Sequence, residues 1–185
     1  AAVVTSLLGK TDAGAVVTVD ATSAATDILE ALSGSIAKVD NITSLTLTAT
    51  EETAEIGNLL GKATDAAVNA AGMSAADLAA VADNISGVAA DGVTGAFTVT
   101  SALSAAQIDV LLGKTATGAT VTITATGMSA AQLSAVEDNM TKVDDIDSIS
   151  ITSSQSAAEI TALLAEADDN AALVDASGMS AAQIT

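Results

Sequence analysis

The strongest constraint on the fold of this chain is an internal repeat with a fixed period. The segment Leu-Leu-Gly-Lys at residues 7–10 recurs at residues 59–62 and again at residues 111–114. A degraded fourth copy, Leu-Leu-Ala-Glu, occupies residues 163–166, so each step is 52 residues (59 − 7, 111 − 59, 163 − 111). Self-similarity at a fixed period predicts an array of equal units, each of which buries its apolar side against its neighbours.

A second motif, Ser-Ala-Ala, divides each unit into two turns. A serine followed three residues later by an acidic residue or glutamine is typical of a capping box, in which both side chains bond free N–H groups at a helix start. We therefore expect a helix after each motif. The pairs are Ser23 with Thr26, Ser74 with Asp77, Ser104 with Gln107, Ser129 with Gln132, Ser156 with Glu159, and Ser180 with Gln183. Met73, Met128 and Met179 each precede such a serine, where an apolar staple is expected rather than a metal ligand.

A short segment of alternating β-branched and apolar residues follows each expected helix, and this alternation predicts a strand. The clearest such segments are residues 17–19, 45–47, 97–99, 121–123 and 149–151. The chain is therefore expected to alternate helix and strand, with shorter and longer turns in succession. Helix–strand turns this short favour parallel pairing with right-handed crossovers.

The expected fold class is α/β: a right-handed β/α solenoid of alternating short and long turns with one parallel sheet. Half of the residues are hydrophobic but only 1% are aromatic, which indicates a thin, layered core. Residues 1–185 form a single array in this interpretation, with turns starting near 23, 52, 74, 104, 129, 156 and 180. Because Ala1 corresponds to Ala105 in the repeat and neither end carries an atypical capping turn, we expect a segment of a longer protein.

The composition of the chain argues against several classes of function. The net charge is −18, from 23 Asp and Glu against 5 lysines, and the chain has no Arg. Binding to nucleic acid or to anionic lipid is therefore not expected. The sequence also lacks His, Cys and Tyr, so Ser–His and Cys–His nucleophile pairs are not available, and we expect no enzyme activity. No apolar run is long enough to span a membrane, so we expect no membrane insertion.

The longer turns resemble leucine-rich repeats. Residues Ile42, Leu45 and Leu47 reproduce the L-x-x-L-x-L spacing of that family, as do Ile146, Ile149 and Ile151. More broadly, the Ser-Ala-Ala-Gln repeats with Thr-rich strands resemble repeat arrays of very large bacterial surface proteins, notably cyanobacterial ones. This resemblance implies an extracellular or cell-surface scaffold, such as an adhesin stalk, a sheath, an S-layer or a fibre. Because a thin stacked core leaves unpaired ends, we also expect self-association, either head-to-tail or lateral.

Aspartates in the loops are candidate calcium ligands, because Ca²⁺ prefers carboxylate oxygens. The acidic residues of one long turn are close together in sequence, and two more follow in the next short turn. The interpretation that they are solvated loop residues remains open, since no EF-hand spacing occurs. The residues are Asp138, Asp144, Asp145 and Asp147, followed by Asp168 and Asp169.

Three Asn-x-Ser/Thr sequences are candidate glycosylation sites, at Asn41, Asn84 and Asn139. Asn84 and Asn139 both lie ten residues after a capping serine (84 − 74 and 139 − 129). The alternative is that these asparagines terminate helices.

The outward side of the expected sheet presents small polar residues, which could pack laterally, contact a glycan or bind ice, or form an ordinary solvated face. The outward column is Asp20, Thr48, Asn69, Thr100, Thr124, Thr152 and Asp175. The candidate contact residues are Thr46, Thr48, Thr98, Thr100, Thr122, Thr124, Ser150 and Thr152.

Overall fold

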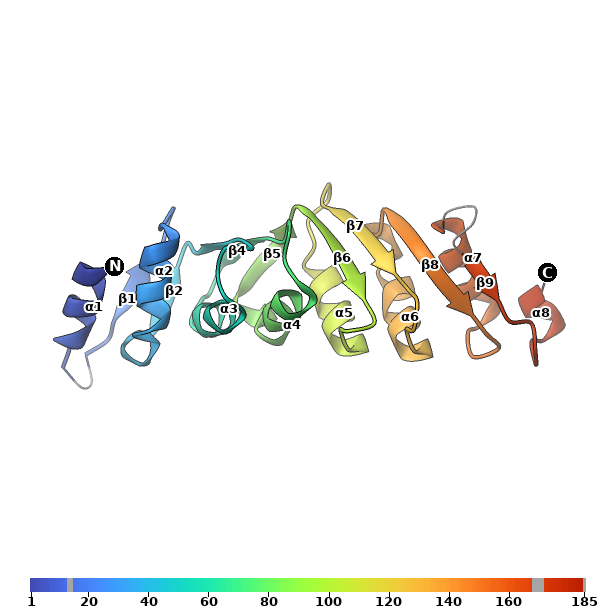
Figure 1. The fold of residues 1–185 in the computed structure, drawn as a ribbon, viewed down its shortest axis with the longest axis horizontal. Coiled ribbons are helices and arrows are strands. Elements are labelled where there is room, and N and C mark those ends of the chain that lie inside the picture. The colour runs from blue at the N-terminus through green and yellow to red at the C-terminus, as the bar shows by residue number, and fades with distance from the viewer. Residues whose placement is uncertain (13–14, 168–171, 185) are drawn as a thin grey trace.

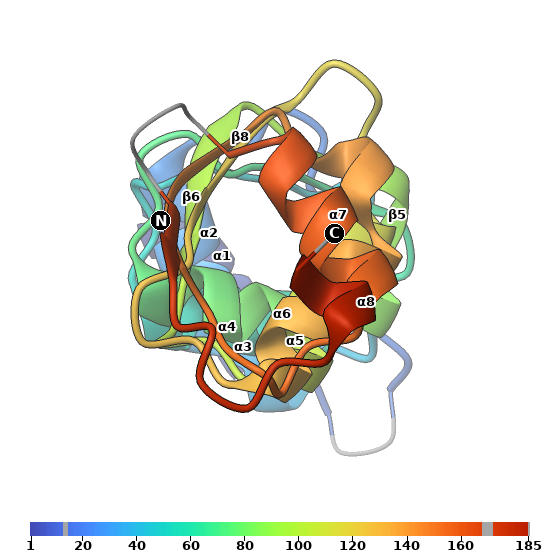
Figure 2. The same ribbon diagram turned by 90° about the vertical axis from the view of Figure 1, so that its right-hand side faces the viewer.

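The computed structural model describes residues 1–12, 15–167 and 172–184 of the chain. Helices and strands alternate along an elongated stack, with the N-terminus at one end and the C-terminus at the other (Figure 1). Seen down the long axis, successive turns lie behind one another around a common interior, with β6 and β8 on one side and α5 to α8 on the other (Figure 2). The α/β class predicted from the sequence is confirmed.

The helices begin where the capping motifs predict, with one exception. Ser74, Ser104, Ser129 and Ser156 each accept a hydrogen bond from the backbone N–H three residues later. Ser23 does not cap a helix: its φ is 52°, and the next helix starts at Thr26 with Ala25 before it. The short side chain of Thr26 lies 3.3 Å from Thr50 and does not close a box. The helices of the described residues are α1 Ala2–Gly9, α2 Thr26–Ser33, α3 Thr53–Leu60, α4 Ala75–Asp83, α5 Ala105–Gly113, α6 Ala130–Asp138, α7 Ala157–Ala165 and α8 Ala181–Ile184, with 3-10 turns η1 Ile36–Lys38, η2 Ile85–Gly87 and η3 Met140–Lys142.

The strands pair in parallel, as predicted, but within the described residues they form three sheets rather than one. Strands β1 and β2 form the first sheet, β3 to β5 the second, and β6 to β9 the third. The expectation of one parallel sheet is therefore wrong. The strands are β1 Thr18–Asp20, β2 Asn41–Thr43, β3 Thr46–Leu47, β4 Ala66–Asn69, β5 Val88–Thr94, β6 Ala96–Thr100, β7 Thr120–Thr124, β8 Asp145–Ile151 and β9 Ala172–Val174.

Both breaks between sheets fall inside a long turn, at a residue with a left-handed backbone. Ser44, with φ of 54°, lies between β2 and β3, and Gly95, with φ of 85°, lies between β5 and β6. A positive φ turns the chain out of the extended conformation and interrupts the ladder. The third long turn has no such residue, so β8 runs unbroken from Asp145 to Ile151 and pairs with both neighbours.

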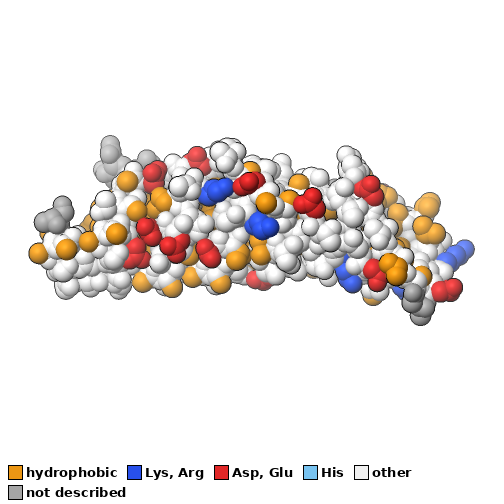
Figure 3. Space-filling model, turned by 180° about the vertical axis from the view of Figure 1, so that it is seen from behind, with side chains coloured by type: hydrophobic (Ala, Val, Ile, Leu, Met, Phe, Trp, Pro, Cys, Tyr) orange, Lys and Arg blue, Asp and Glu red, His pale blue; other side chains and the backbone are white. Residues whose placement is uncertain are grey.

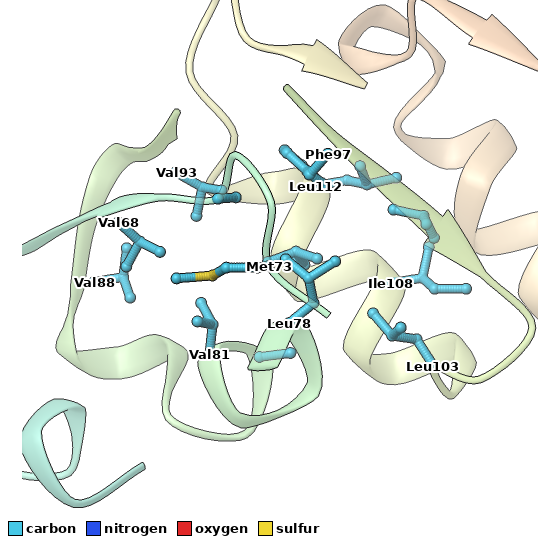
Figure 4. Packing of buried hydrophobic residues seen from close by; sticks show 14 of the residues in the cluster. Val68, Met73, Leu78, Val81, Val88, Val93, Phe97, Leu103, Ile108 and Leu112 are labelled. Atoms are coloured by element: carbon cyan, nitrogen blue, oxygen red, sulfur yellow. The ribbon is translucent and has the colours of Figure 1, made fainter. Parts of the chain in front are cut away.

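One hydrophobic core extends through the stack from Leu8 to Leu163. The residues that resemble the leucine-rich pattern all point inward: Ile42, Leu47, Ile146 and Ile151 are fully buried. The methionine before each cap packs against this core, as the staple interpretation predicts. Figure 4 shows Met73 reaching into the space between Val88 of β5 and Val81 of α4.

The second 52-residue unit has the same total length as the others, but its short and long turns differ in length from theirs. Its capping serine comes 55 residues before that of the next unit (129 − 74), whereas the Leu-Leu-Gly-Lys segments stay 52 apart. The surplus appears in β5, where the pairing with β4 shifts from Ala66↔Val88 to Val68↔Val93. The chain bulges between these pairs at Asp91, whose φ is 53°.

A matched pair of leucines tests how much stability the stacked core contributes. Leu111 is fully buried, whereas Leu7, two periods earlier at the same position, is 68% exposed. We expect Leu111→Ala to lower the free energy of unfolding by about 2–5 kcal/mol through the lost burial and the cavity. Leu7→Ala should change it by less than about 0.5 kcal/mol. Chemical denaturation followed by circular dichroism measures both, and equal effects would contradict this account of the core.

Candidate functional site

The outward column of small polar residues forms turns at the strand ends. In six of its seven members the side-chain oxygen accepts the backbone N–H two residues later, at 2.9–3.3 Å. These are Asx and Ser/Thr turns, in which a short polar side chain replaces a backbone acceptor. Thr124 is the exception. The six residues are Asp20, Thr48, Asn69, Thr100, Thr152 and Asp175.

This role weakens the interpretation of the Thr rows as a continuous contact surface. The structure places Thr98 beside Thr122, and Thr100 beside Thr124, in the pairing of β6 with β7. Neither Thr98 nor Thr122 makes a side-chain hydrogen bond within the described part of the chain. The other candidates are separated from this patch or occupied: Thr46 lies in another sheet beside Ala67, Ser150 lies beside Leu173, Thr48 bonds Glu51 and Thr152 bonds Gln155.

Glu51 and Gln155 are equivalent in the repeat, 104 residues apart, and both are buried at the corner between a strand and the next helix. The sequence analysis did not identify this position. Glu51 accepts the backbone N–H of Thr48 at 2.7 Å, and Gln155 accepts that of Thr152 at 2.8 Å. Leu103, midway between them, is equally buried. The position therefore needs a side chain that fills the corner. The equal 52-residue spacing of residues 51, 103 and 155 could have identified this position from the sequence.

The capping glutamines also join one turn to the one before it. The Oε1 atom of Gln132 accepts the N–H of Ser129 at 2.8 Å, while its Nε2 donates to the carbonyls of Leu103 and Ser101 at 2.5 and 3.1 Å. Gln183 repeats the arrangement with Ser180, Gln155 and Ser153. An acidic side chain can close the box but cannot donate to a carbonyl. Glutamine at these positions thus holds the stack together as well as starting a helix.

Three of the five lysines donate to backbone carbonyls of the preceding turn. Lys38 bonds Thr11 at 3.2 Å and, 104 residues later, Lys142 bonds Thr115 at 2.5 Å. Lys114 bonds Val88 at 2.9 Å. Lys142 also forms an ion pair of 3.2 Å with Asp91 in the β5 bulge. These scarce cations therefore stabilise contacts between turns.

The predicted calcium ligands do not converge. In the described ranges, no three acidic side chains lie close enough to hold a metal ion together. Asp144 already accepts the backbone N–H of Val121 at 2.7 Å, just as Asp40 accepts that of Val17. Asp138 ends α6, and Asp145 and Asp147 belong to β8. Asp168 and Asp169 lie outside the described residues, and calcium binding stays a prediction.

Two of the predicted glycosylation residues terminate helices. Asn84 is the C-cap of α4 and Asn139 that of α6. Their Nδ2 atoms donate to the carbonyls of Ala80 and Ala135, at 2.9 and 3.0 Å. A glycan replaces one of the two hydrogens on this nitrogen, so modified Asn84 could keep its single bond, whereas Asn139, which also donates to Asp109, would lose one of its two. Asn41 lies in β2, half-buried, and glycosylation there stays a prediction.

Comparison with known proteins identifies no relative: no family model, curated protein or solved structure matches this chain. Across the residues that the structure describes, no helix has the length and apolar character needed to cross a bilayer.

The two functions of the capping glutamine can be separated by mutation. Gln132→Glu keeps the acceptor for Ser129 but removes the donor to Leu103 and Ser101, and brings a carboxylate close to two carbonyl oxygens. We expect a loss of about 1–3 kcal/mol in the free energy of unfolding. Glu159→Gln is the matched control, because Glu159 closes its box without donating: glutamine keeps the acceptor for Ser156 and loses only the smaller contribution of the charge, so its loss should stay well below that of Gln132→Glu. Similar losses for the two variants would exclude the turn-to-turn role.

Acidic capping residues predict a pH dependence of stability. Partial burial alone would raise the pKa of Asp77, but hydrogen bonds from Thr53 and Ser74 outweigh it and lower the pKa below its ordinary value. The N–H and hydroxyl of Ser156 lower the pKa of Glu159. A lowered folded-state pKa contributes stability above the unfolded-state value, near 4, that is lost as the pH falls.

We expect the double variant Asp77→Asn, Glu159→Gln to lose less stability than the native chain between about pH 5 and pH 3. The other 21 carboxylates (23 − 2) titrate in both proteins, so their difference isolates the two caps. Urea denaturation at a series of pH values measures it. Parallel pH curves would show that the caps do not titrate with folding.

Proposed function

We propose that this chain is a structural repeat scaffold of the cell surface that provides length and spacing and has no catalytic role. The observation that supports it best is the unbroken core from Leu8 to Leu163, reinforced by side-chain bonds between adjacent turns. Such a stack converts sequence length into physical length, because each added turn extends one axis. Adhesin stalks, sheaths, S-layers and fibres all need that property.

We also propose that the fold is one right-handed β/α solenoid, in which the three sheets are successive parts of a single winding. Isolated parallel bridges support it. Ile42 of β2 pairs with Ala63, and Val93 of β5 pairs with Thr115, so contact between neighbouring turns continues where the regular ladder breaks. Parallel strands with a crossover between them are right-handed in nearly all proteins.

The charge distribution supports an extracellular location. Most of the carboxylates in the described ranges are exposed, and only two ion pairs occur there, Ala1 with Asp27 and Lys142 with Asp91. The view from behind shows acidic side chains spread along the stack (Figure 3). A surface with a net charge of −18 is best tolerated where salt or divalent cations screen its self-repulsion.

The second candidate is a binding module that recognises a glycan or ice. One observation favours it: Thr98 and Thr122 lie side by side on neighbouring strands, on the outward side of the third sheet. The patch is small, because the second Thr row contributes to the turns at the strand ends. The scaffold explains more of the molecule and is the function that we propose.

Immunogold labelling tests the proposed function. Antibodies raised against the chain should label intact cells of the source organism, with gold particles at a distance from the membrane that reflects an extended scaffold. Labelling that appears only after permeabilisation would overturn the proposal. Cells that lack the coding sequence are the control for specificity.

A further inference from the structure

We propose that the last residue of each 3-10 turn determines how closely a long turn stacks on the short turn before it. Lysine gives a wide junction that its side chain bridges, and glycine gives a close junction. The three positions are equivalent, because each ends a 3-10 turn and is followed by a buried valine. They hold Lys38, Gly87 and Lys142. The steps between them are 49 and 55 residues (87 − 38, 142 − 87), so the 52-residue period does not reveal their equivalence.

Both lysines reach back to equivalent carbonyls of the preceding turn. The Nζ atom of Lys38 donates to the carbonyl of Thr11 at 3.2 Å, and that of Lys142 donates to the carbonyl of Thr115 at 2.5 Å. Thr11 and Thr115 lie two periods apart, and each directly follows a Leu-Leu-Gly-Lys segment. At these two junctions a lysine side chain therefore spans the space between the backbones of neighbouring turns.

At the middle position the backbone itself occupies this space. A Cβ atom at Gly87 would lie 2.3 Å from the carbonyl oxygen of Leu60 and 3.3 Å from that of Ala63. Ala63 is the equivalent of Thr11 and Thr115 in the repeat. Real Cβ atoms essentially never lie within 3.0 Å of such an atom, so a turn with lysine at this position cannot stack as closely. The junction before the second long turn is therefore the close one.

The close contact, and not the backbone conformation, requires glycine at residue 87. The φ of Gly87 is not positive, so other residues can adopt it. Lys38 and Lys142 end 3-10 turns of the same length, which shows that lysine is compatible with this local structure. What lysine cannot reproduce is the direct approach to the carbonyl of Leu60. Close approach of two backbones is a common reason for a buried glycine.

The junction after the second long turn is bridged in its place. Lys114, in the next short turn, donates to the carbonyl of Val88 at 2.9 Å. Val88 directly follows Gly87, and its own side chain packs in the core (Figure 4). Among the residues that the structure describes, Lys62, one period before Lys114, makes no such bond. Glu166, one period after it, is a carboxylate with no proton to donate. The second long turn is thus bridged by lysine to the turn after it, whereas the first and third are bridged to the turn before.

One residue in each long turn then determines where the stack is compact and where it is open along the edge that carries the 3-10 turns. Unequal spacing along one edge bends a stack towards its closer side, so this position can set the direction of a long array without altering its core. As a property of a scaffold, the inference rests on the proposed function, but the junctions can be tested on the chain itself.

Three substitutions at residue 87 test the proposal. Gly87→Ala adds a Cβ atom, separates the turns and gives no bond in return. Gly87→Lys also separates them, but its amine can bond the carbonyl of Ala63, as Lys38 and Lys142 bond theirs. Gly87→Met has a similar length without the amine. We expect the midpoint of urea denaturation to fall for all three, and to fall least for Gly87→Lys. A buried glycine without this role would tolerate alanine best, because lysine is almost never fully buried.

Ser86→Lys is the control for charge, because Ser86 is exposed in the same 3-10 turn and the substitution adds the same charge to this acidic chain. Its midpoint should stay near the native one, and any shift that it shows is subtracted from that of Gly87→Lys. A corrected loss for Gly87→Lys that equals or exceeds the loss for Gly87→Ala or Gly87→Met would overturn the proposal.

The spacing itself can be measured between two spin labels, since the chain contains no native cysteine. Glu30→Cys and Asp138→Cys place labels on exposed residues of α2 and α6, on either side of the second long turn. Double electron–electron resonance should give a longer mean distance when Gly87→Lys is added, and the native distance when Ser86→Lys is added. A folded Gly87→Lys variant with the native distance would reject the proposal. Neither readout concerns the location of the protein, so the scaffold function would stand if this inference failed.

Discussion

No turn of this molecule can bury its own apolar side, and the rest of the structure depends on that constraint. A helix of four to nine residues and a strand of two to seven supply too little surface for an independent core. Each turn is therefore stable only between neighbours, which is why Leu59 and Leu111 are fully buried and Leu7 is not. The near absence of aromatic residues fits this arrangement, because the space between a strand and its helix accepts Leu, Ile and Val but little that is larger.

Polar contacts make the association of turns specific. Apolar stacking alone would tolerate a shifted register, since Leu, Ile and Val recur throughout. The Nε2 atom of Gln132 and the Nζ atom of Lys142 each bond a defined carbonyl of the preceding turn. Asp144 does the same for the N–H of Val121. These groups would lose their partners in a shifted stack, and buried polar groups without partners are costly.

Much of the fold could be predicted from the repeat, since periodicity determines where helices begin and which residues point inward. The predicted single sheet failed at Ser44 and Gly95, because a positive φ at one residue leaves no trace in the alternation of apolar residues. The constant 52-residue spacing also gave no sign of the irregularity around Asp91, where the long turn is longer and the short turn before it is shorter than in the next unit.

The candidate surface was harder to predict. An outward Asp or Thr at a strand end looks the same in the sequence whether it contacts a ligand or bonds the backbone two residues later, as Asp20 and Thr100 do. Glutamine in a capping box likewise gives no sign that its amide nitrogen reaches the preceding turn. Only the stacking of turns brings Gln132 beside Leu103.

The arrangement of turns along one axis has a mechanical consequence. A load applied to the two ends acts across the parallel ladders and opens their hydrogen bonds one after another, because the pull runs perpendicular to the strands. Each opened turn, half of a 52-residue unit, releases a length of up to about 90 Å of extended chain. The neighbouring turn then becomes the new end of the stack. Under tension the molecule would lengthen in steps and dissipate energy, and when the load falls it could rewind from the turns that remain.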